Sequence, residues 1–259
     1  MRWSAKGPGT VPTWKMQTKE DTGRSLTLLR AFRDEQSDPA RFYCLLADDS
    51  VRQVARYLEL KGQLVLDIGG GEGYFSQAFR RAEAVCVLVE PERGAIEIND
   101  ATGAQTPFVI GNGSHLPFAT GTVDVSFASN VLEHVPEPTE FVAEMVRVTR
   151  PGGIVYVSFT NWYSPWGGHG TSPWHYLGGS RALRRFERRR GHPPINRFGE
   201  NLFPTHVGPM LRWARENSSV EVLEAVPRYH PRWCHWLVRV PLLREVATWN
   251  LLLILRRRS

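Results

Sequence analysis

The residues best placed for chemistry form a short glycine-rich segment at the end of an apolar run. Asp67 closes the run, and glycines follow at positions 69, 71 and 73 before a stretch typical of a helix begins. Because glycine has no side chain, such a loop lets a ligand reach the backbone at the end of a strand. The segment "VLDIGGGEGYFS" therefore predicts a small-molecule site at a strand-to-helix turn.

The glycine spacing distinguishes between two classes of nucleoside ligand. A dinucleotide fingerprint requires G-x-G-x-x-G after the first strand. Neither register fits, because Tyr74 or Glu72 takes the place of a required glycine. Glu72 would also meet a pyrophosphate at the helix start, where backbone N–H groups otherwise favour an anion. A nucleoside with a positive sulfonium and an amino-acid tail has no pyrophosphate, so Glu72 does not disfavour it in this way.

Five segments, in order along residues 65–160, support the second class. The loop "VLDIGGGEG" resembles the first motif of class I S-adenosylmethionine-dependent methyltransferases. The segments "VCVLVEPE", "IGNGSHLPF", "VDVSFASNVLEHV" and "VRVTRPGGIVYVSF" resemble the strands and loops that follow it in that family. The whole chain also resembles uncharacterised actinobacterial methyltransferases with an N-W-x-S-P-W-G-G-H segment.

The resemblance implies a set of contacts for S-adenosyl-L-methionine, whose product is S-adenosyl-L-homocysteine. Asp67 and Gly69 would meet its methionine and ribose end, and Glu90 would accept hydrogen bonds from the ribose hydroxyls. Gly71 and Gly73 would keep the loop close to it, where a Cβ would intrude. The implied contacts on the adenine side and at the boundary with the substrate are Asn112, Gly113, Ser114 and Asn130. Asn112 replaces the usual aspartate of the family, so its amide oxygen would accept without charge assistance.

Two histidines in a Trp-rich, Gly-rich segment are the candidates for catalysis. Methyl transfer from a sulfonium mainly requires alignment of the nucleophile with the methyl carbon. A hydroxyl acceptor also benefits from a general base, and histidine suits neutral pH. We favour His169 over His175 because it lies nearer the end of the preceding strand, and a packing role for both is the alternative. His134 is interpreted as structural or adjacent to the cofactor. No metal motif is present, so a metal-independent reaction is expected.

The acceptor is expected to be a small molecule, a glycan or a lipid. Aromatic residues with a few polar groups between 160 and 204 suit an organic acceptor. The arginines of "RALRRFERRRGH" favour an anionic group on it or an anionic lipid surface, with a solvated helix face as the alternative. Nucleic acid is an improbable partner, since no nucleic-acid-binding signature accompanies the charge. A SAM-binding protein without catalysis and a nicotinamide dehydrogenase are the rival functions.

Strands and helices alternate through the middle of the chain. Strands are predicted near 64–68, 84–90, 107–110, 123–128 and 153–159, and helices near 48–60, 74–82, 92–100, 137–149 and 205–216. Such alternation predicts an α/β fold with parallel strands and helices on both faces. Strand-like segments follow at 220–227 and 247–257. The resemblance implies a Rossmann-like, doubly wound, mostly parallel seven-stranded sheet, with 248–256 as an antiparallel last strand inside it.

The composition is that of a globular protein, with 259 residues and a net charge of +6. We divide it into an N-terminal arm at 1–45, partly irregular with a short helix near 25–36, and a methyltransferase domain at 46–259. The domain carries a substrate-side insert at about 160–204.

Three scattered cysteines argue against a disulfide framework or a zinc site. A signal peptide and a run of about 18 apolar residues are both lacking, so a cytoplasmic protein with, at most, peripheral membrane contact is expected.

Overall fold

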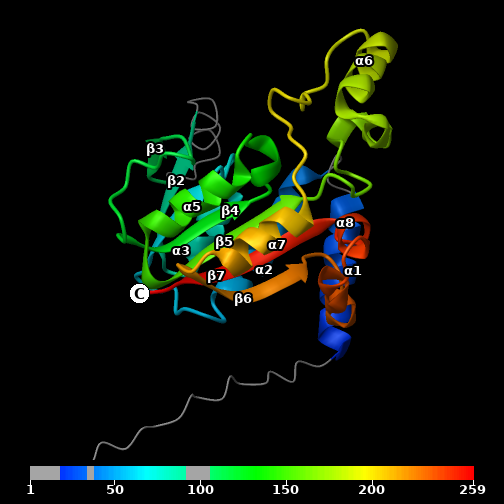
Figure 1. The fold of residues 1–259 in the computed structure, drawn as a ribbon. Helices are drawn as coiled ribbons and strands as arrows, with labels where there is room; N and C mark the ends of the chain where they lie inside the picture. Colours follow the sequence, from blue (N-terminus) through cyan, green and yellow to red (C-terminus); the bar gives the residue numbers. More distant parts are fainter. Residues whose placement is uncertain (1–17, 34–37, 92–105) are drawn as a thin grey trace, which may run out of the picture.

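The computed structural model describes residues 18–33, 38–91 and 106–259. Seven strands form one sheet in the order β3-β2-β1-β4-β5-β7-β6, and β7 runs antiparallel to both of its neighbours (Figure 1). The remaining pairs are parallel, which confirms the predicted Rossmann-like fold. The strands are β1 (Leu64–Ile68), β2 (Val85–Glu90), β3 (Phe108–Ile110), β4 (Val123–Ser129), β5 (Thr149–Thr160), β6 (Val220–Pro227) and β7 (Asn250–Arg257).

The last strand shows why an apolar run near the C-terminus belongs inside the sheet. Residues 250–255 of β7 are all buried, and Leu253 pairs with Val157 of β5. A strand covered on both faces reads as a continuous apolar run without alternation. The interior strand is confirmed. It begins two residues later and ends one residue later than the predicted 248–256.

Helices cover both faces of the sheet, which confirms the predicted layers. The helices α5 (Pro138–Val148) and α7 (Val207–Glu216) pack on one face. The helices α1 (Thr18–Arg33), α2 (Pro39–Val54) and α3 (Tyr74–Arg81) pack on the other. On that second face, Phe127 of β4 lies against Phe75 and Phe79 of α3 and stacks on Tyr156 of β5 at 4.6 Å between ring centroids. This packing holds α3 against β4.

The N-terminal helices differ from the sequence prediction. The helix expected at 48–60 with its cap at Asp49 or Ser50 is instead α2, which begins at Pro39 after the capping residue Asp38. Proline is well suited to a first helical position, since its missing N–H would be unpaired there. Asp49 and Ser50 are buried inside the helix. The short helix predicted near 25–36 corresponds to α1, which begins earlier, at Thr18, and α2 also occupies the end of the predicted arm. The helix predicted at 92–100 lies outside the described residues.

The insert after β5 contains short helical elements where an irregular loop was expected. It includes η2 (His169–Thr171), η3 (Trp174–Leu177) and α6 (Gly179–Arg190), and α6 stands away from the sheet (Figure 1). The arginine-rich stretch is thus a helix. Three further elements complete the described chain: η1 (Leu132–His134), η4 (Arg232–Arg239) and α8 (Leu243–Ala247). Within the described ranges, every helix is too short or too polar to cross a membrane.

Candidate active site

The glycine loop lies between β1 and α3 with its backbone in left-handed conformations. Gly69, Gly71 and Gly73 have φ values of +73°, +55° and +80°, which side-chain-bearing residues rarely adopt. A Cβ built on Gly71 would have no atom within 4 Å, so this part of the loop faces open space. The loop therefore exposes bare backbone at Gly71.

Asp67 lies beneath this loop. Its side chain is 1% exposed, and the Ser76 hydroxyl donates to its Oδ2 at 2.6 Å, while Oδ1 is buried without a hydrogen-bond partner. A Cβ on Gly70 would collide with this carboxylate, so the two pack directly together. Burial raises the pKa of Asp67 to about 7, against the lowering effect of the Ser76 hydrogen bond. An orphaned carboxylate oxygen at this position is free to accept a donor from a ligand.

Glu90 ends the neighbouring strand β2 and closes the other side of the loop. Its carboxylate is 9% exposed and accepts the backbone N–H of Gly71 through Oε1. Burial raises the pKa of Glu90, and the Gly71 N–H opposes this effect. The structure thus brings Asp67, Glu90 and the glycines together at adjacent carboxyl ends of parallel strands, where such folds bind ligands.

The residues of the segment after β3 make contacts within the protein that shape the loop they form. The side-chain oxygen of the exposed Asn112 accepts the backbone N–H of Ser114 at 2.9 Å and so holds a turn. Gly113 packs against the ring of Phe141, which a Cβ would overlap. These residues follow β3, which pairs with the strand that carries Glu90, and each shapes the loop itself.

Asn130 follows β4 with a φ of +58°, which is uncommon for a residue other than glycine. Its side-chain oxygen accepts a hydrogen bond from the amide of Asn250 at 2.9 Å. Among the predicted cofactor contacts, it is the one that also lines the large cavity described next. Asn130 therefore links the predicted cofactor contacts to the cavity.

A cavity of about 590 Å³ opens beside Asn130 and is rich in aromatic side chains. This volume is within the usual range for small-molecule sites. Phe32 of α1 lies 4.9 Å from Trp166 and 6.0 Å from Tyr229 between ring centroids, so the N-terminal helix closes one wall. The described lining residues are Leu29, Phe32, Pro39, Phe42, Tyr43, Asn130, Glu133, His134, Thr160, Trp166, His169, Gly170, Asn196, Tyr229, Trp249 and Asn250.

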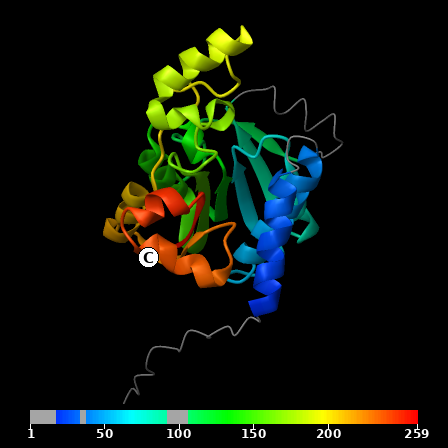
Figure 2. The ribbon, with the colours of Figure 1, turned by 90° about the vertical axis from the view of Figure 1, so that its right-hand side faces the viewer.

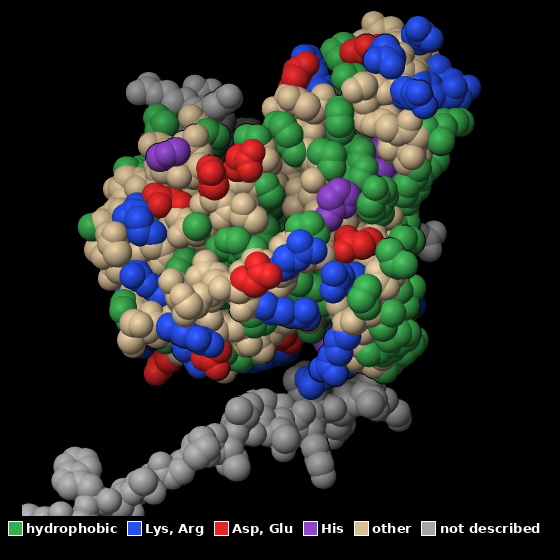
Figure 3. Space-filling model, viewed as in Figure 1, with side chains coloured by type: hydrophobic (Ala, Val, Ile, Leu, Met, Phe, Trp, Pro, Cys, Tyr) green, Lys and Arg blue, Asp and Glu red, His purple; other side chains and the backbone are tan. Residues whose placement is uncertain are grey.

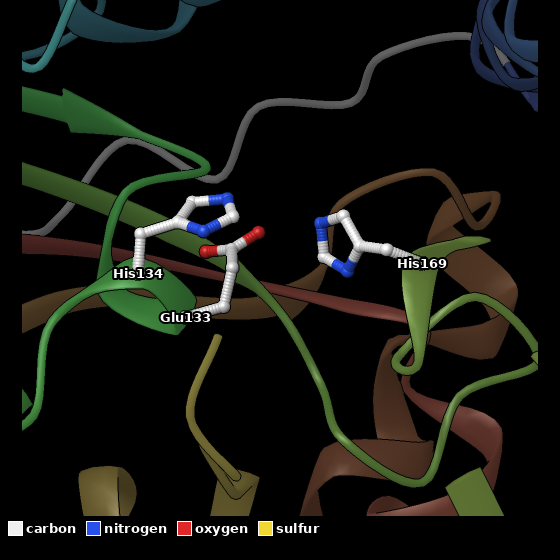
Figure 4. A group of neighbouring side chains, drawn as sticks. All are labelled: Glu133, His134 and His169. Atoms are coloured by element: carbon white, nitrogen blue, oxygen red, sulfur yellow. The ribbon is translucent and has the colours of Figure 1, made fainter. Parts of the chain in front are cut away.

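Three titratable side chains of the cavity wall, Glu133, His134 and His169, form a cluster (Figure 4). Donor or acceptor atoms of all three lie within 4.8 Å of one another. The Glu133 carboxylate is 2% exposed; its Oε1 accepts the N–H of Thr160 at 3.0 Å, and its Oε2 has no partner. His134 donates from Nδ1 to the carbonyl of Asn201 at 2.7 Å, which fixes its ring.

His169 reaches this cluster from η2. Its φ is +48°, and burial lowers the pKa of its imidazole, while the charge of Glu133 opposes that effect. The neutral ring is therefore favoured at neutral pH. A neutral imidazole beside a buried carboxylate can accept a proton and have the resulting charge stabilised.

His175 lies elsewhere. It is 1% exposed, packs edge-on against Trp162 at 5.3 Å between ring centroids, and is not among the described residues of the cavity wall. Both of its ring nitrogens are buried, and the carbonyls of Ser164 and Trp162 lie nearby outside hydrogen-bond geometry. The structure thus separates the two histidines that the sequence grouped together.

Comparisons with known proteins decide the family. The family described as "Methyltransferase domain" matches residues 66–157. A protein of Mycobacteroides abscessus named as an uncharacterized methyltransferase is 46% identical over 249 residues, covering 91% of this chain and 94% of its own length. A Mycobacterium marinum protein of the same description is 46% identical over 243 residues, with coverage of 91% and 94%. The chain belongs to the class I S-adenosylmethionine-dependent methyltransferases.

Solved structures agree with this family at the level of the fold. The S-adenosylmethionine-dependent methyltransferase of Mesorhizobium loti matches with a TM-score of 0.56 at 17% identity, over 80% of this methyltransferase and 96% of that chain. A geranyl diphosphate methyltransferase in complex with SAM matches with a TM-score of 0.52 at 16% identity, over 84% and 91%. These structures confirm the predicted fold, and the family match confirms the predicted family and its cofactor.

The residues present in this methyltransferase fit its cofactor. The open space over Gly71 and the unpartnered oxygen of Asp67 are the features that a bound nucleoside with an amino-acid tail would use. Sequence reasoning missed two parts of the site. It gave Glu133 no role, although its position beside His134 was visible, and it treated the aromatic residues of α1 and α2 as an arm outside the domain.

Proposed function

We propose that this methyltransferase methylates an oxygen atom of a small-molecule, glycan or lipid acceptor bound in the aromatic cavity. The observation that carries the proposal is the position of His169 beside the buried Glu133 in the wall of that cavity. An imidazole held in this way suits removal of a proton from a hydroxyl. The aromatic lining suits an organic acceptor.

The cofactor is assigned to the loop side of the site. Bound S-adenosylmethionine would supply a methyl group activated by a positive sulfonium. The backbone of the loop and the carboxylates beside it would hold its methionine and ribose end, and the segment after β3 would contact its adenine. The proposed contacts are Asp67, Gly69, Gly71, Gly73, Glu90, Asn112, Gly113, Ser114 and Asn130.

His169 is proposed to take the proton of the acceptor hydroxyl. Its Nδ1 lies 3.5 Å from the carbonyl oxygen of Gly167, a long contact that favours the proton on Nδ1 and leaves Nε2 as the acceptor. Glu133 stabilises the positive charge that the ring then gains, because its unpartnered oxygen is buried nearby. His175 has no part in this step, since it packs outside the cavity.

A chelator tests whether Glu133, His134 and His169 act without a metal. Carboxylate and imidazole groups are also ligands of divalent metals. The proposed proton transfer predicts that activity survives prolonged treatment with EDTA. Loss of activity on EDTA treatment and its recovery with a divalent metal would contradict the role given to His169.

The decisive experiment identifies the acceptor. Purified protein is incubated with a host extract and S-adenosylmethionine labelled on its methyl group, and the labelled product is isolated and its methylated atom determined. An O-methyl product is expected. His169→Ala should lower transfer by about 100-fold or more while cofactor binding stays unchanged. His192→Ala, at an exposed histidine beyond α6, is the control.

Labelling at nitrogen or carbon alone would refute oxygen methylation. Glu90→Ala separates the two halves of the site, because it should weaken cofactor binding by about 2–4 kcal/mol through loss of charge-assisted hydrogen bonds. Unchanged affinity in calorimetry would remove Glu90 from the cofactor site.

The cytoplasmic location of the protein stays a prediction, and the three unpaired cysteines suit it.

A further inference from the structure

The segment from η4 through α8, residues 232–247, forms an apolar surface that we call the η4–α8 surface. Trp233 is 71% exposed and Leu242 is 84% exposed. Large apolar side chains exposed side by side are uncommon on a monomer and mark interaction sites. The η4 and α8 elements pack on each other and lie side by side in Figure 2. The exposed apolar residues are Trp233, Trp236, Val240, Leu242, Leu243 and Val246.

The periodicity of η4 aligns its interfacial side chains. In a 3₁₀-helix, residues three apart eclipse each other, so Trp233, Trp236 and Arg239 share one face. All three are exposed, whereas Cys234 and Val238 between them are buried. The helix therefore buries one side in the protein and presents two indoles and a guanidinium to the outside.

The turn that follows holds an aliphatic side chain away from the protein. Leu242 has a φ of +67°, a conformation that is rare for residues other than glycine and that clusters at functional positions. Val246, one turn into α8, is 60% exposed. The surface thus combines tryptophans at its edge with aliphatic side chains at its tip.

The charge of the η4–α8 surface is positive. Its one acidic residue, Glu245, is engaged inward, since it accepts the N–H groups of Val207 and Gly208 and pairs with Arg244. Its other charged side chains are arginines, including Arg239 on the tryptophan face. Figure 3 shows hydrophobic side chains gathered along the right-hand edge of the molecule, where α8 lies in Figure 1.

This combination fits the interface of an anionic bilayer. Tryptophan is favoured at the level of lipid headgroups, aliphatic side chains enter the acyl boundary, and arginine is attracted to anionic lipids. We propose that the η4–α8 surface docks this methyltransferase onto anionic phospholipid membranes. Membrane docking goes beyond the proposed reaction, because that reaction requires no membrane.

The position of the surface connects docking to the acceptor. Tyr229 precedes η4, Trp249 follows α8, and both line the cavity. A membrane bound to the η4–α8 surface therefore lies next to the cavity wall. If the proposed reaction holds, the acceptor is a lipid drawn from that membrane, and this last step alone rests on the proposed function.

Vesicle binding tests the docking without any methyl transfer. The protein is sedimented with vesicles of phosphatidylcholine, or of phosphatidylcholine mixed with phosphatidylglycerol, in the absence of cofactor. Binding should be at least about tenfold tighter to the anionic vesicles and should shift tryptophan emission to shorter wavelength. The variant Trp233→Ser/Trp236→Ser/Leu242→Ser should lose binding about tenfold or more. Val85→Ser, at an apolar residue 54% exposed on β2, is the matched control.

Circular dichroism and cofactor affinity of the triple variant establish that it is folded. Docking is overturned if the folded triple variant binds anionic vesicles as tightly as the parent, or if the parent binds neither kind of vesicle. It is also overturned if the parent is a dimer in solution that the triple variant dissociates, because a second copy then covers the surface. Failure to methylate an acceptor leaves vesicle binding unaffected, so the two proposals fail separately.

Discussion

Replacing Asp67 by asparagine tests the burial of the carboxylate beneath the glycine loop. Burial raises its pKa from 3.8 to about 7. The folded state therefore binds this proton more tightly than the unfolded chain, and stability falls as pH rises from about 4 to about 7. At 1.36 kcal/mol per pKa unit, the loss amounts to up to about 4 kcal/mol. The asparagine amide does not ionise, so the variant lacks this contribution.

The assay is urea unfolding of the parent and of Asp67→Asn at several pH values across that window. The difference between the two free energies of unfolding should change by up to about 4 kcal/mol in favour of the variant as pH rises. The difference is the useful quantity, because other carboxylates titrate equally in both proteins. A difference that stays constant with pH would refute the inference that the Asp67 carboxyl is held in a desolvated site.

The same acid should couple protonation to cofactor binding. A cofactor that carries cationic groups favours ionised Asp67, so its binding near pH 6 should release close to one proton. Calorimetry in buffers of different ionisation enthalpy measures this release. Asp67→Asn should remove it and lower the affinity. Equal proton release by parent and variant would exclude Asp67 as the source.

Three further predictions concern the rest of the site and the sheet. Glu133→Gln should lower kcat about tenfold and move the acid limb of the rate profile to lower pH, because the lost charge had raised the pKa of His169; an unmoved limb would contradict the pairing. Gly113→Ala should destabilise the fold by about 1–3 kcal/mol in urea unfolding through overlap with Phe141, and unchanged stability would refute this packing role. Deleting residues 247–259 should give insoluble protein, and a soluble truncation that binds cofactor would contradict the need for β7.

The fold was predictable because its signals are local. An apolar run such as Leu251–Leu255 specifies a doubly buried strand, and the order of motifs supplied the topology. The start of α2 was missed because Asp49 and Ser50 have the residue types of a cap, yet tertiary partners bury them: Arg24 binds Asp49 at 2.6 Å, and Arg228 binds Ser50 at 2.7 Å.

The candidate site was predictable only where one segment carries it. Asp67 and the glycines follow one another in the chain, so their shared location was visible. His169 and His175 are near neighbours in the sequence, and only the folding of the insert places the first in the cavity wall and the second in packing outside it. The contribution of Phe32 depends on how α1 lies across the domain, which local patterns do not encode.

The place of β7 inside the sheet has a consequence for biosynthesis. Until residues 250–257 have been synthesised, β5 and β6 lack the strand that lies between them in the sheet, because β7 pairs with both. A nascent chain then carries two open strand edges with unpaired backbone groups, which favour aggregation. A chain stalled or cleaved before this strand would therefore depend on chaperones, whereas the finished chain closes both edges in one step.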